Sequence, residues 1–544
     1  MSEPPNKNNS SQGFDKLNIA PRAMLFVFTA VVTYFGWREL FFLTDDSFIA
    51  FRYIANSLAG YGLVWNPPPF RPVEGYTSFL WVIILEAIWR ITGVEPPQAA
   101  NWVALAFGYG TLFLGYRLVE RMTLHSGLNR HRLALTGMVL CGTLTNRTFL
   151  TWLSSGLETA MFNFFMTWWI ARALTPYSAR RTWTLKLTAA ASLTALTRPD
   201  GLLIMLATLI LLAGHWRFRL KRTNWSWREG VWSWPLLAVP LHLVWRKYFY
   251  GAWLPNTFYA KNLPPWPTAG LRYDWCFIWE NGIEIWFLFI LAWLFKIRRY
   301  DRHKVLELAV QQWPHFLVLG AVLIYLSYYT FIVGGDHFEY RVYSFLIPLL
   351  YVSAVWLINQ TTYKAWAACG MMLAFILASY PIAWMQYYAT KKVTDLTAPI
   401  AQNFPQPLRP LIAQYDEYQS WLTNRFICFR HHKHKVFYEQ QMSEYRSDLP
   451  RPTTAWRKTR KVMAVPGVGI IGWLNLDTAI IDTLGLNDRV IAHHPFLNDA
   501  LKMAHRRLPP DGYLECFLND ATGAPRQTSI TDDEIRQCET HKWY

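Results

Sequence analysis

Apolar stretches of about twenty residues recur through the first two thirds of the chain, separated by short polar segments. They begin near residues 23, 100, 133, 159, 187, 202, 231, 275, 313, 342 and 365. A helix needs about twenty apolar residues to cross the hydrocarbon core of a bilayer. The pattern therefore predicts a polytopic α-helical membrane protein with about eleven transmembrane helices.

Four basic stretches separate the apolar ones, at residues 117–132, 179–186, 217–228 and 296–304. Because Lys and Arg gather in cytoplasmic loops, all four are expected inside the cell. A further spanning helix at residues 78–91 would move the first of them outside. That segment is short and carries Glu86 and Arg90 four residues apart, so we predict a helix lying on the outer surface of the membrane.

This topology divides the chain into three parts. Residues 1–22 form a cytoplasmic tail, and residues 23–386 form the membrane domain, with a first outer loop at residues 44–99. The composition turns polar after Pro381, and the parity of the helices places residues 387–544 outside the cytoplasm as a soluble domain. Alternating and β-branched residues at 462–482, with turns and helices after them, predict a mixed α/β fold.

Composition agrees with a membrane protein, since 52% of the 544 residues are hydrophobic, 17% aromatic and only 16% charged. The net charge is +17, but most Lys and Arg lie between apolar stretches, so nucleic-acid binding is not expected. The six cysteines show no zinc-ligand spacing. A disulfide between Cys516 and Cys538 is compatible with an extracytoplasmic domain. The histidine-rich basic run at residues 430–435 is interpreted as a solvated contact to an anionic surface.

Ionisable residues collect in the predicted outer loops, beginning with Asp45 and Asp46 directly after the first apolar stretch. Such groups at the membrane boundary tend to face a cavity or one another. A partly dehydrated carboxylate has a raised pKa and can take a proton from an attacking hydroxyl. The alternative is that the two acids only cap the helix that follows. The other members of the set are Arg52, Arg71, Glu74, Glu158, Arg198, Asp200, Lys261, Asp336, His337, Glu339 and Arg341.

Cations in the same loops could bind the phosphate group of a lipid. An ammonium group binds phosphate as a point charge and a guanidinium binds it bidentately, so Lys261 and Arg341 are the first candidates. Arg198 and Arg52 complete the predicted donor phosphate-binding set. For Arg198 the alternative is a simple ion pair with Asp200. Two adjacent carboxylates can also hold a divalent cation or need none, so metal dependence stays open.

Six blocks, in order along the chain, resemble one family. They are LTDDSFIAFRYIANSLAGYGLVWN with PVEGYTSFLW, SSGLETAMF, TRPDGLL, LPNTFYAK, GGDHFEYR and IDTLGLNDRVIAHH. The set is similar to the GT-C superfamily of polyprenyl-phosphate-dependent glycosyltransferases. Within it, the blocks most resemble the branch of the mycobacterial terminal arabinofuranosyltransferases.

The resemblance implies an enzyme of the bacterial inner membrane and cell envelope, whose active site and C-terminal domain face the periplasm. It would transfer a sugar, expected to be arabinofuranose, from a polyprenyl-phosphate donor such as decaprenyl-phosphate arabinose to a glycan, pilin or lipid acceptor. The displacement would be inverting, with Asp45 or Asp46 as the base and Asp45 slightly preferred. Sugar or acceptor contacts are expected from Glu74, Tyr76, Glu158, Asn256, Asp336 and His337.

Several alternatives remain beside this interpretation. Glu74 can belong to a turn and Glu158 to a helix cap, with no role in binding. In GGDHFEYR, His337 and Phe338 replace the apolar residue and Met that usually follow in the family, which leaves the role of Asp336 open. The whole chain can also be a mannose or other hexose transferase, a transporter of lipid-linked sugars, or a structural membrane protein. Transporters often contain inverted repeats, and no repeat is found in this sequence.

Overall fold

The computed structural model describes residues 19–543, apart from 176–180, 220–229, 263, 300, 302, 304–309, 363, 392–395, 445–458, 497–502, 504–506 and 519–529. Most of the predicted cytoplasmic tail at residues 1–22 lies outside the described residues. So does most of the basic stretch at residues 217–228, together with parts of those at 179–186 and 296–304.

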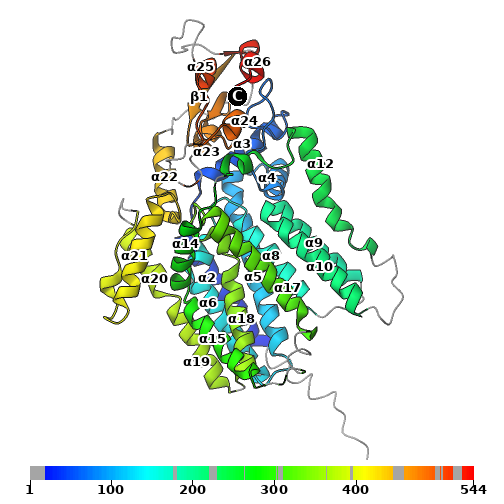
Figure 1. Ribbon diagram of the computed structural model, residues 1–544, viewed down its shortest axis with the longest axis vertical. Coiled ribbons are helices and arrows are strands. Elements are labelled where there is room, and N and C mark those ends of the chain that lie inside the picture. Colours follow the sequence, from blue (N-terminus) through cyan, green and yellow to red (C-terminus); the bar gives the residue numbers. More distant parts are fainter. Residues whose placement is uncertain are drawn as a thin grey trace, which may run out of the picture.

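A bundle of long helices forms the lower part of the molecule in Figure 1. Among the described residues, five helices are long and apolar enough to cross a membrane: Ile19–Glu39, Pro96–Thr123, Trp313–Val333, Arg341–Thr361 and Ala365–Thr390. A sixth candidate is a pair of helices, Pro267–Glu280 and Ile283–Ile297, bent by 83°. The predicted multi-pass α-helical membrane protein is therefore confirmed.

Each predicted apolar stretch coincides with a helix or a pair of helices. They are α2 (Ile19–Glu39), α5 (Pro96–Thr123), α6 (Arg132–Thr145), α8 (Thr159–Ala173), α9 (Arg181–Thr197), α10 (Leu202–Arg219), η4 (Trp234–Leu237) with α12 (Ala238–Tyr250), α14 (Pro267–Glu280) with α15 (Ile283–Ile297), α17 (Trp313–Ser327), α18 (Leu346–Thr361) and α19 (Ala365–Ala378). Only some of them are long and apolar enough to cross a membrane, so the count of eleven spans stays a prediction.

One predicted boundary is wrong. The apolar stretch near residue 275 begins inside α14, and the chain then bends at Gly282 before α15. Gly282 has φ +62°, and a Cβ there would lie 2.8 Å from the backbone nitrogen of Ser379. Glycine allows both this conformation and this contact, so the sharp bend forms at that position. Most of α14 thus belongs to the loop that was predicted to lie outside the membrane, residues 251–274.

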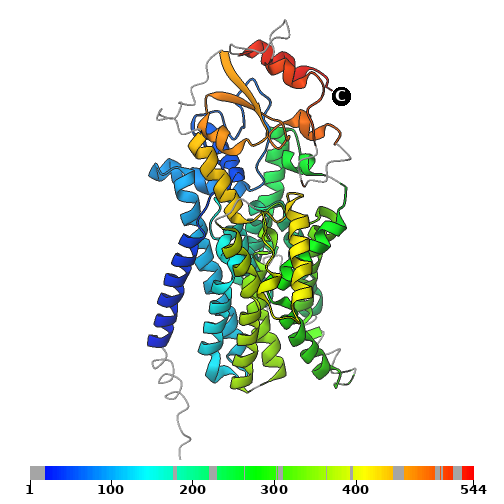
Figure 2. The ribbon, with the colours of Figure 1, turned by 90° about the vertical axis from the view of Figure 1, so that its left-hand side faces the viewer.

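The first outer loop holds two helices between the bundle and the C-terminal part (Figure 1). α3 (Asp45–Leu58) is buried along most of its length, from Ser47 to Asn56. α4 (Phe79–Thr92) is the predicted surface helix, and in Figure 2 it lies across the upper end of the bundle. Its Arg90 donates to Glu86 at 2.7 Å, as the spacing predicted.

The C-terminal part is mixed α/β, as predicted. β1 (Thr459–Val465) pairs in parallel with β2 (Thr478–Asp482), with Lys461 opposite Thr478, and antiparallel with β3 (Ile530–Thr531). The helices around this sheet are α23 (Gly469–Leu474), α24 (Arg489–His493), α25 (Tyr513–Leu518) and α26 (Asp532–Thr540). A disulfide between Cys516 and Cys538 joins α25 to α26, which confirms that pairing.

Helices on the flank connect the bundle to the sheet: α20 (Pro381–Thr390), α21 (Arg409–Thr423) and α22 (His431–Glu444), at the left of Figure 1. α21 packs against α14, so residues just after 387 contact the bundle. The remaining short elements are η1 (Asn129–His131), α7 (Arg147–Thr151), η2 (Pro199–Gly201), α13 (Asn256–Lys261), the π-helix η5 (Tyr328–Val333), η6 (Arg341–Tyr343) and η7 (Ala401–Asn403).

Candidate functional site

Backbone pairing holds the start of α3 against the loop that follows α7. The amide of Thr44 donates to the carbonyl of Ser155, and the amide of Ser155 donates to the carbonyl of Phe42, both at 3.0 Å. Gly156 has φ +76°, and a Cβ there would lie 2.7 Å from the side chain of Ser47. This close approach fixes the position of the two aspartates that open α3.

A second pairing positions Asp336 and His337. Their segment forms backbone hydrogen bonds of 2.7–3.0 Å with Cys428 and Phe429, just before α22. The Nδ1 atom of His337 lies 2.8 Å from the carbonyl oxygen of Phe426, and its ring stacks on Phe429 with centroids 5.2 Å apart. His337 is thus held on two sides by residues about ninety positions away in sequence.

Charges from separate segments converge on His337. Burial lowers the pKa of its ring, while the carbonyl of Phe426 and the carboxylates of Asp46 and Asp336 oppose this change and the ammonium group of Lys261 adds to it. Asp46 is half-buried and Lys261 is exposed at the end of α13. Neither side chain forms a hydrogen bond or an ion pair with another described residue. The cluster of Asp46, His337, Asp336 and Lys261, which we call the Asp46 cluster, therefore holds an unpaired carboxylate and an unpaired cation.

Arg341 borders the Asp46 cluster. Its Nε and Nη2 atoms donate to Asp336 at 3.0 and 3.3 Å, and its guanidinium lies 4.4 Å from the centre of the Phe338 ring. Its Nη1 group makes no hydrogen bond with the described residues, which leaves donors for an anion. Asp336 fixes the orientation of this guanidinium.

Arg198 is fully engaged in ion pairs. It donates to Glu158 at 3.0 Å, to Asp200 at 2.8 and 2.9 Å and to the hydroxyl of Tyr329 at 3.1 Å. The alternative of an Arg198–Asp200 pair is confirmed. Two carboxylates neutralise this guanidinium, so the geometry argues against the predicted phosphate contact of Arg198 and the predicted sugar contact of Glu158.

Asp45 contacts the C-terminal part. Its carboxylate accepts the amides of Gly469 at 3.2 Å and Ile470 at 2.7 Å. Burial raises the pKa of Asp45 to about 6; the amide of Ile470 lowers it, Asp46 raises it further, and the amide of Gly469 lowers it. Asp45 thus joins α3 to α23.

Arg52 was predicted to bind phosphate, and this prediction is wrong. The side chain is fully buried, and its donors bind the carbonyl oxygens of Trp65, Gly472, Asn475 and Thr478 and the side-chain oxygen of Asn66 at 2.6–3.2 Å. All five N–H groups of a guanidinium are used in this way. Arg52 fastens the C-terminal part to the first outer loop.

Three residues that were predicted to contact the sugar or the acceptor instead bind other parts of the protein. The side-chain amide nitrogen of Asn256 donates to the carbonyls of Gly485, Leu486 and Asp488 at 2.8–3.1 Å, so it has no donor left for a sugar. Glu74 is buried in an ion pair with Arg246, and the hydroxyl of Tyr76 bonds to that of Tyr250 at 3.1 Å. Neither Glu74 nor Tyr76 lies in the Asp46 cluster. Burial raises the pKa of Glu74 to about 7, against the opposing effect of Arg246.

Gly469 allows the contact between α23 and Asp45. A Cβ at this position would lie 1.9 Å from the carbonyl oxygen of Asp45. We expect Gly469→Ala to lower the free energy of unfolding by about 1–3 kcal/mol, the usual cost of overpacking. Gly467→Ala is the matched control, since its nearest atom, Cζ of Phe437, would be 3.8 Å away. Equal melting temperatures of the two variants in detergent would contradict this account.

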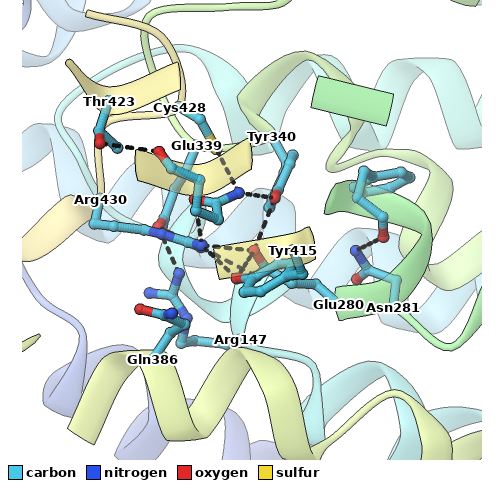
Figure 3. Close-up of polar contacts among 12 residues, drawn as sticks. Arg147, Glu280, Asn281, Glu339, Tyr340, Gln386, Tyr415, Thr423, Cys428 and Arg430 are labelled. Atoms are coloured by element: carbon cyan, nitrogen blue, oxygen red, sulfur yellow. Dashed lines mark hydrogen bonds and ion pairs between the residues drawn. The ribbon is translucent and has the colours of Figure 1, made fainter. Parts of the chain in front are cut away.

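A buried polar network that the sequence did not predict is centred on Arg430 (Figure 3). Arg430 donates to Glu280 at 2.6 and 3.0 Å and to Glu339 at 3.4 Å, and Arg147 donates to Glu339 at 2.5 Å. Tyr340, Tyr415 and Gln419 complete it. Arg430, His431 and His432 are 2–4% exposed, so the interpretation of residues 430–435 as a solvated basic surface is wrong for these three. The aromatic residues that flank the run, Phe429 before it and Phe437 and Tyr438 after it, were the available signal.

No group of three His, Cys, Asp or Glu side chains among the described residues is arranged to hold a metal ion.

Comparison with known proteins adds one relative and a set of solved structures. No protein-family model matches the chain. A terminal β-(1→2)-arabinofuranosyltransferase of Mycobacterium tuberculosis is 29% identical over 251 residues, which is 43% of this chain and 37% of the relative. The match thus spans well under half of that protein's length. The resemblance to mycobacterial terminal arabinofuranosyltransferases inferred from the six blocks is confirmed by this match.

Two solved structures are similar at low sequence identity. ArnT of Cupriavidus metallidurans, bound to undecaprenyl phosphate, has a TM-score of 0.48 and 12% identity over 85% of this chain and 86% of that one. The oligosaccharyltransferase of Archaeoglobus fulgidus has a TM-score of 0.42 and 12% identity over 85% of this chain and 64% of that one.

Proposed function

We propose that the protein is an inverting membrane glycosyltransferase that takes arabinofuranose from a polyprenyl-phosphate donor and transfers it to an extracytoplasmic acceptor. The observation that carries the proposal is that the unpaired carboxylate of Asp46 and the unpaired ammonium group of Lys261 both act electrostatically on His337. A base and a phosphate-binding cation in one cluster are what this displacement requires. The match to an arabinofuranosyltransferase supports the choice of sugar.

In this mechanism Asp46 is the base. The acceptor oxygen bonds to the anomeric carbon of the sugar while the bond from that carbon to the phosphate oxygen breaks. The hydroxyl proton passes to the Asp46 carboxylate, and the electron pair of the broken bond leaves with the lipid phosphate. Lys261 and the free Nη1 group of Arg341 stabilise the charge of the leaving phosphate, which needs no general acid because its pKa is already low.

Asp45 has a different part in the proposal, although the two residues are adjacent. Its hydrogen bonds to Gly469 and Ile470 hold the first turn of α3. We therefore infer that Asp45 positions Asp46, which reverses the slight preference for Asp45 as the base. His337, neutral because its pKa is lowered by burial, can orient the acceptor hydroxyl toward Asp46.

The test is incubation of the purified protein with decaprenyl-phosphate arabinofuranose and, separately, with decaprenyl-phosphate mannose. The proposal expects release of decaprenyl phosphate, or transfer to an added acceptor, from the arabinose donor. Turnover of the mannose donor alone would indicate a hexose transferase. Movement of intact donor across vesicles without cleavage would indicate a transporter.

The proposal places the Asp46 cluster and the C-terminal domain in the periplasm, on the side opposite the basic stretches. In intact cells, a cysteine at Asp533, which is 92% exposed, should react with an impermeant thiol reagent. A cysteine at Thr182, in the basic stretch at residues 179–186 and in the first turn of α9, should react only after the cells are opened. The background is a variant without Cys141 and Cys369. Labelling of Thr182→Cys in intact cells would refute this orientation.

A further inference from the structure

A hollow lies between the first outer loop, the end of α12 and α24. Its volume is about 130 Å³, about four times the volume of a water molecule in the liquid. Glu74, Lys247, Trp253, Tyr259, Arg489 and His493 are among its lining residues. No residue of the Asp46 cluster lines it. Asn256 and Tyr259 of α13, the short helix that ends at Lys261, do line it, so the hollow adjoins the proposed transfer site without sharing a residue with the Asp46 cluster.

Two cations meet at this hollow without a counter-ion. The Nζ atom of Lys247 donates to the carbonyl of Gly251 at 3.0 Å, and Nη1 of Arg489 lies 3.5 Å from the place a Cβ of Gly251 would take. Neither cation forms an ion pair with a described residue. Burial raises the pKa of Glu539, and the charge of Arg489 lowers it at longer range to a smaller extent. Glu74 lines the same hollow but is already paired with Arg246. Two unneutralised cations around one small hollow favour an anion with several oxygen atoms, such as phosphate.

The exposed face of the η4–α12 segment runs up to this hollow. An apolar stripe at spacings of three and four residues is formed by Trp234, Leu237, Leu241, Val244 and Tyr248, each at least 59% exposed. The opposite face buries His242 and Arg246. In a membrane protein, an exposed apolar stripe on a helix contacts acyl chains. Because the stripe ends beside Lys247, the hollow lies at the level of lipid headgroups.

We propose that this hollow binds the phosphate headgroup of an anionic glycerophospholipid, with its acyl chains along the stripe on α12. Lys247 and Arg489 contact the phosphate oxygens, and Trp253, which is 52% exposed, packs at the boundary between headgroup and acyl chains. A glycerophospholipid suits the site better than a reacting donor lipid, because a donor must place its sugar in the Asp46 cluster. The choice of a glycerophospholipid over a donor lipid rests on the proposed function, while the phosphate contacts of Lys247 and Arg489 do not.

The test uses the full chain in detergent, titrated with phosphatidylglycerol, phosphatidylcholine, undecaprenyl phosphate or inorganic phosphate, with binding followed by native mass spectrometry. We expect phosphatidylglycerol to bind most tightly. In Lys247→Gln/Arg489→Gln its affinity should fall at least about tenfold, since two charge-assisted hydrogen bonds are lost. Lys247→Arg should keep the affinity. Arg90→Gln, which removes an exposed cation from α4, should leave it unchanged.

Equal binding of phosphatidylglycerol to the wild type and the double variant would overturn the proposal, as would equal binding of phosphatidylcholine. Tighter binding of undecaprenyl phosphate would assign the hollow to a carrier lipid, and competition by inorganic phosphate at equal concentration would assign it to a free anion; both results also overturn it. If the double variant does not fold, the single variants Lys247→Glu and Lys247→Arg are compared in its place. Binding of phosphatidylglycerol that is lost in Lys247→Glu and kept in Lys247→Arg supports the site, and equal binding to both overturns it.

Discussion

Asp46→Asn should reduce sugar transfer by roughly 10²–10⁴-fold, the usual effect of removing a positioned base. The amide keeps the shape of the side chain but cannot accept the proton of the acceptor hydroxyl. Because the carboxylate of Asp46 has no hydrogen-bond partner among the described residues, its replacement removes no structural contact. The melting temperature should therefore stay within about a degree of the wild type while transfer from decaprenyl-phosphate arabinofuranose is lost.

Asp45→Asn is the informative control because it makes the same change at the adjacent residue. One of its two backbone hydrogen bonds, to Gly469 or Ile470, must be lost, since an amide nitrogen cannot accept an N–H. We expect this variant to be less stable and to lose less activity than Asp46→Asn. If Asp46→Asn transfers sugar at the wild-type rate while Asp45→Asn is inactive, the two roles are exchanged. If both are active, the pair is only a helix cap and the mechanism is wrong.

The sequence predicted the helices well because their signal is local. A stretch of about twenty apolar residues favours a helix whatever the rest of the chain does, and each predicted stretch coincides with a helix or a pair of helices. The ion pair of Glu86 with Arg90 follows from spacing on one helix for the same reason. The bend at Gly282 was missed because its cause, the backbone near Ser379, is almost a hundred residues away.

The functional site was predictable only in part. The predicted topology placed the acids and cations of the outer loops on the same side of the membrane. In the structure Asp46, Asp336 and Lys261 act on His337, and Arg341 binds Asp336. Arg52 belonged to the same group by position, yet its partners include backbone carbonyls more than four hundred residues away. Backbone carbonyls carry no signature in the sequence, so an arginine that binds them resembles one that awaits a phosphate.

The buried network around Arg430 should have the largest effect on stability. Arg430 is the only cation that forms an ion pair with Glu280 among the described residues, and both side chains are at most 3% exposed. In Arg430→Met, Glu280 remains buried without a counter-ion, which costs about 3–5 kcal/mol. The expected result is a large fall in the melting temperature of the detergent-solubilised protein. Arg90→Ala, which breaks an exposed pair on α4, should cost about 0.5 kcal/mol or less.

A double variant separates the buried charge from simple loss of packing. In Arg430→Met/Glu280→Gln the unpaired carboxylate is gone, and the hydroxyls of Tyr340 and Tyr415 can still donate to the side-chain oxygen of the new glutamine. We expect part of the lost stability to return, because the cost of Arg430→Met arises mainly from the uncompensated charge. Since the segment 426–430 also pairs with the backbone at His337, the destabilised single variant should lose transfer as well. A single variant that melts like Arg90→Ala would show that the network contributes little to holding this segment on the bundle.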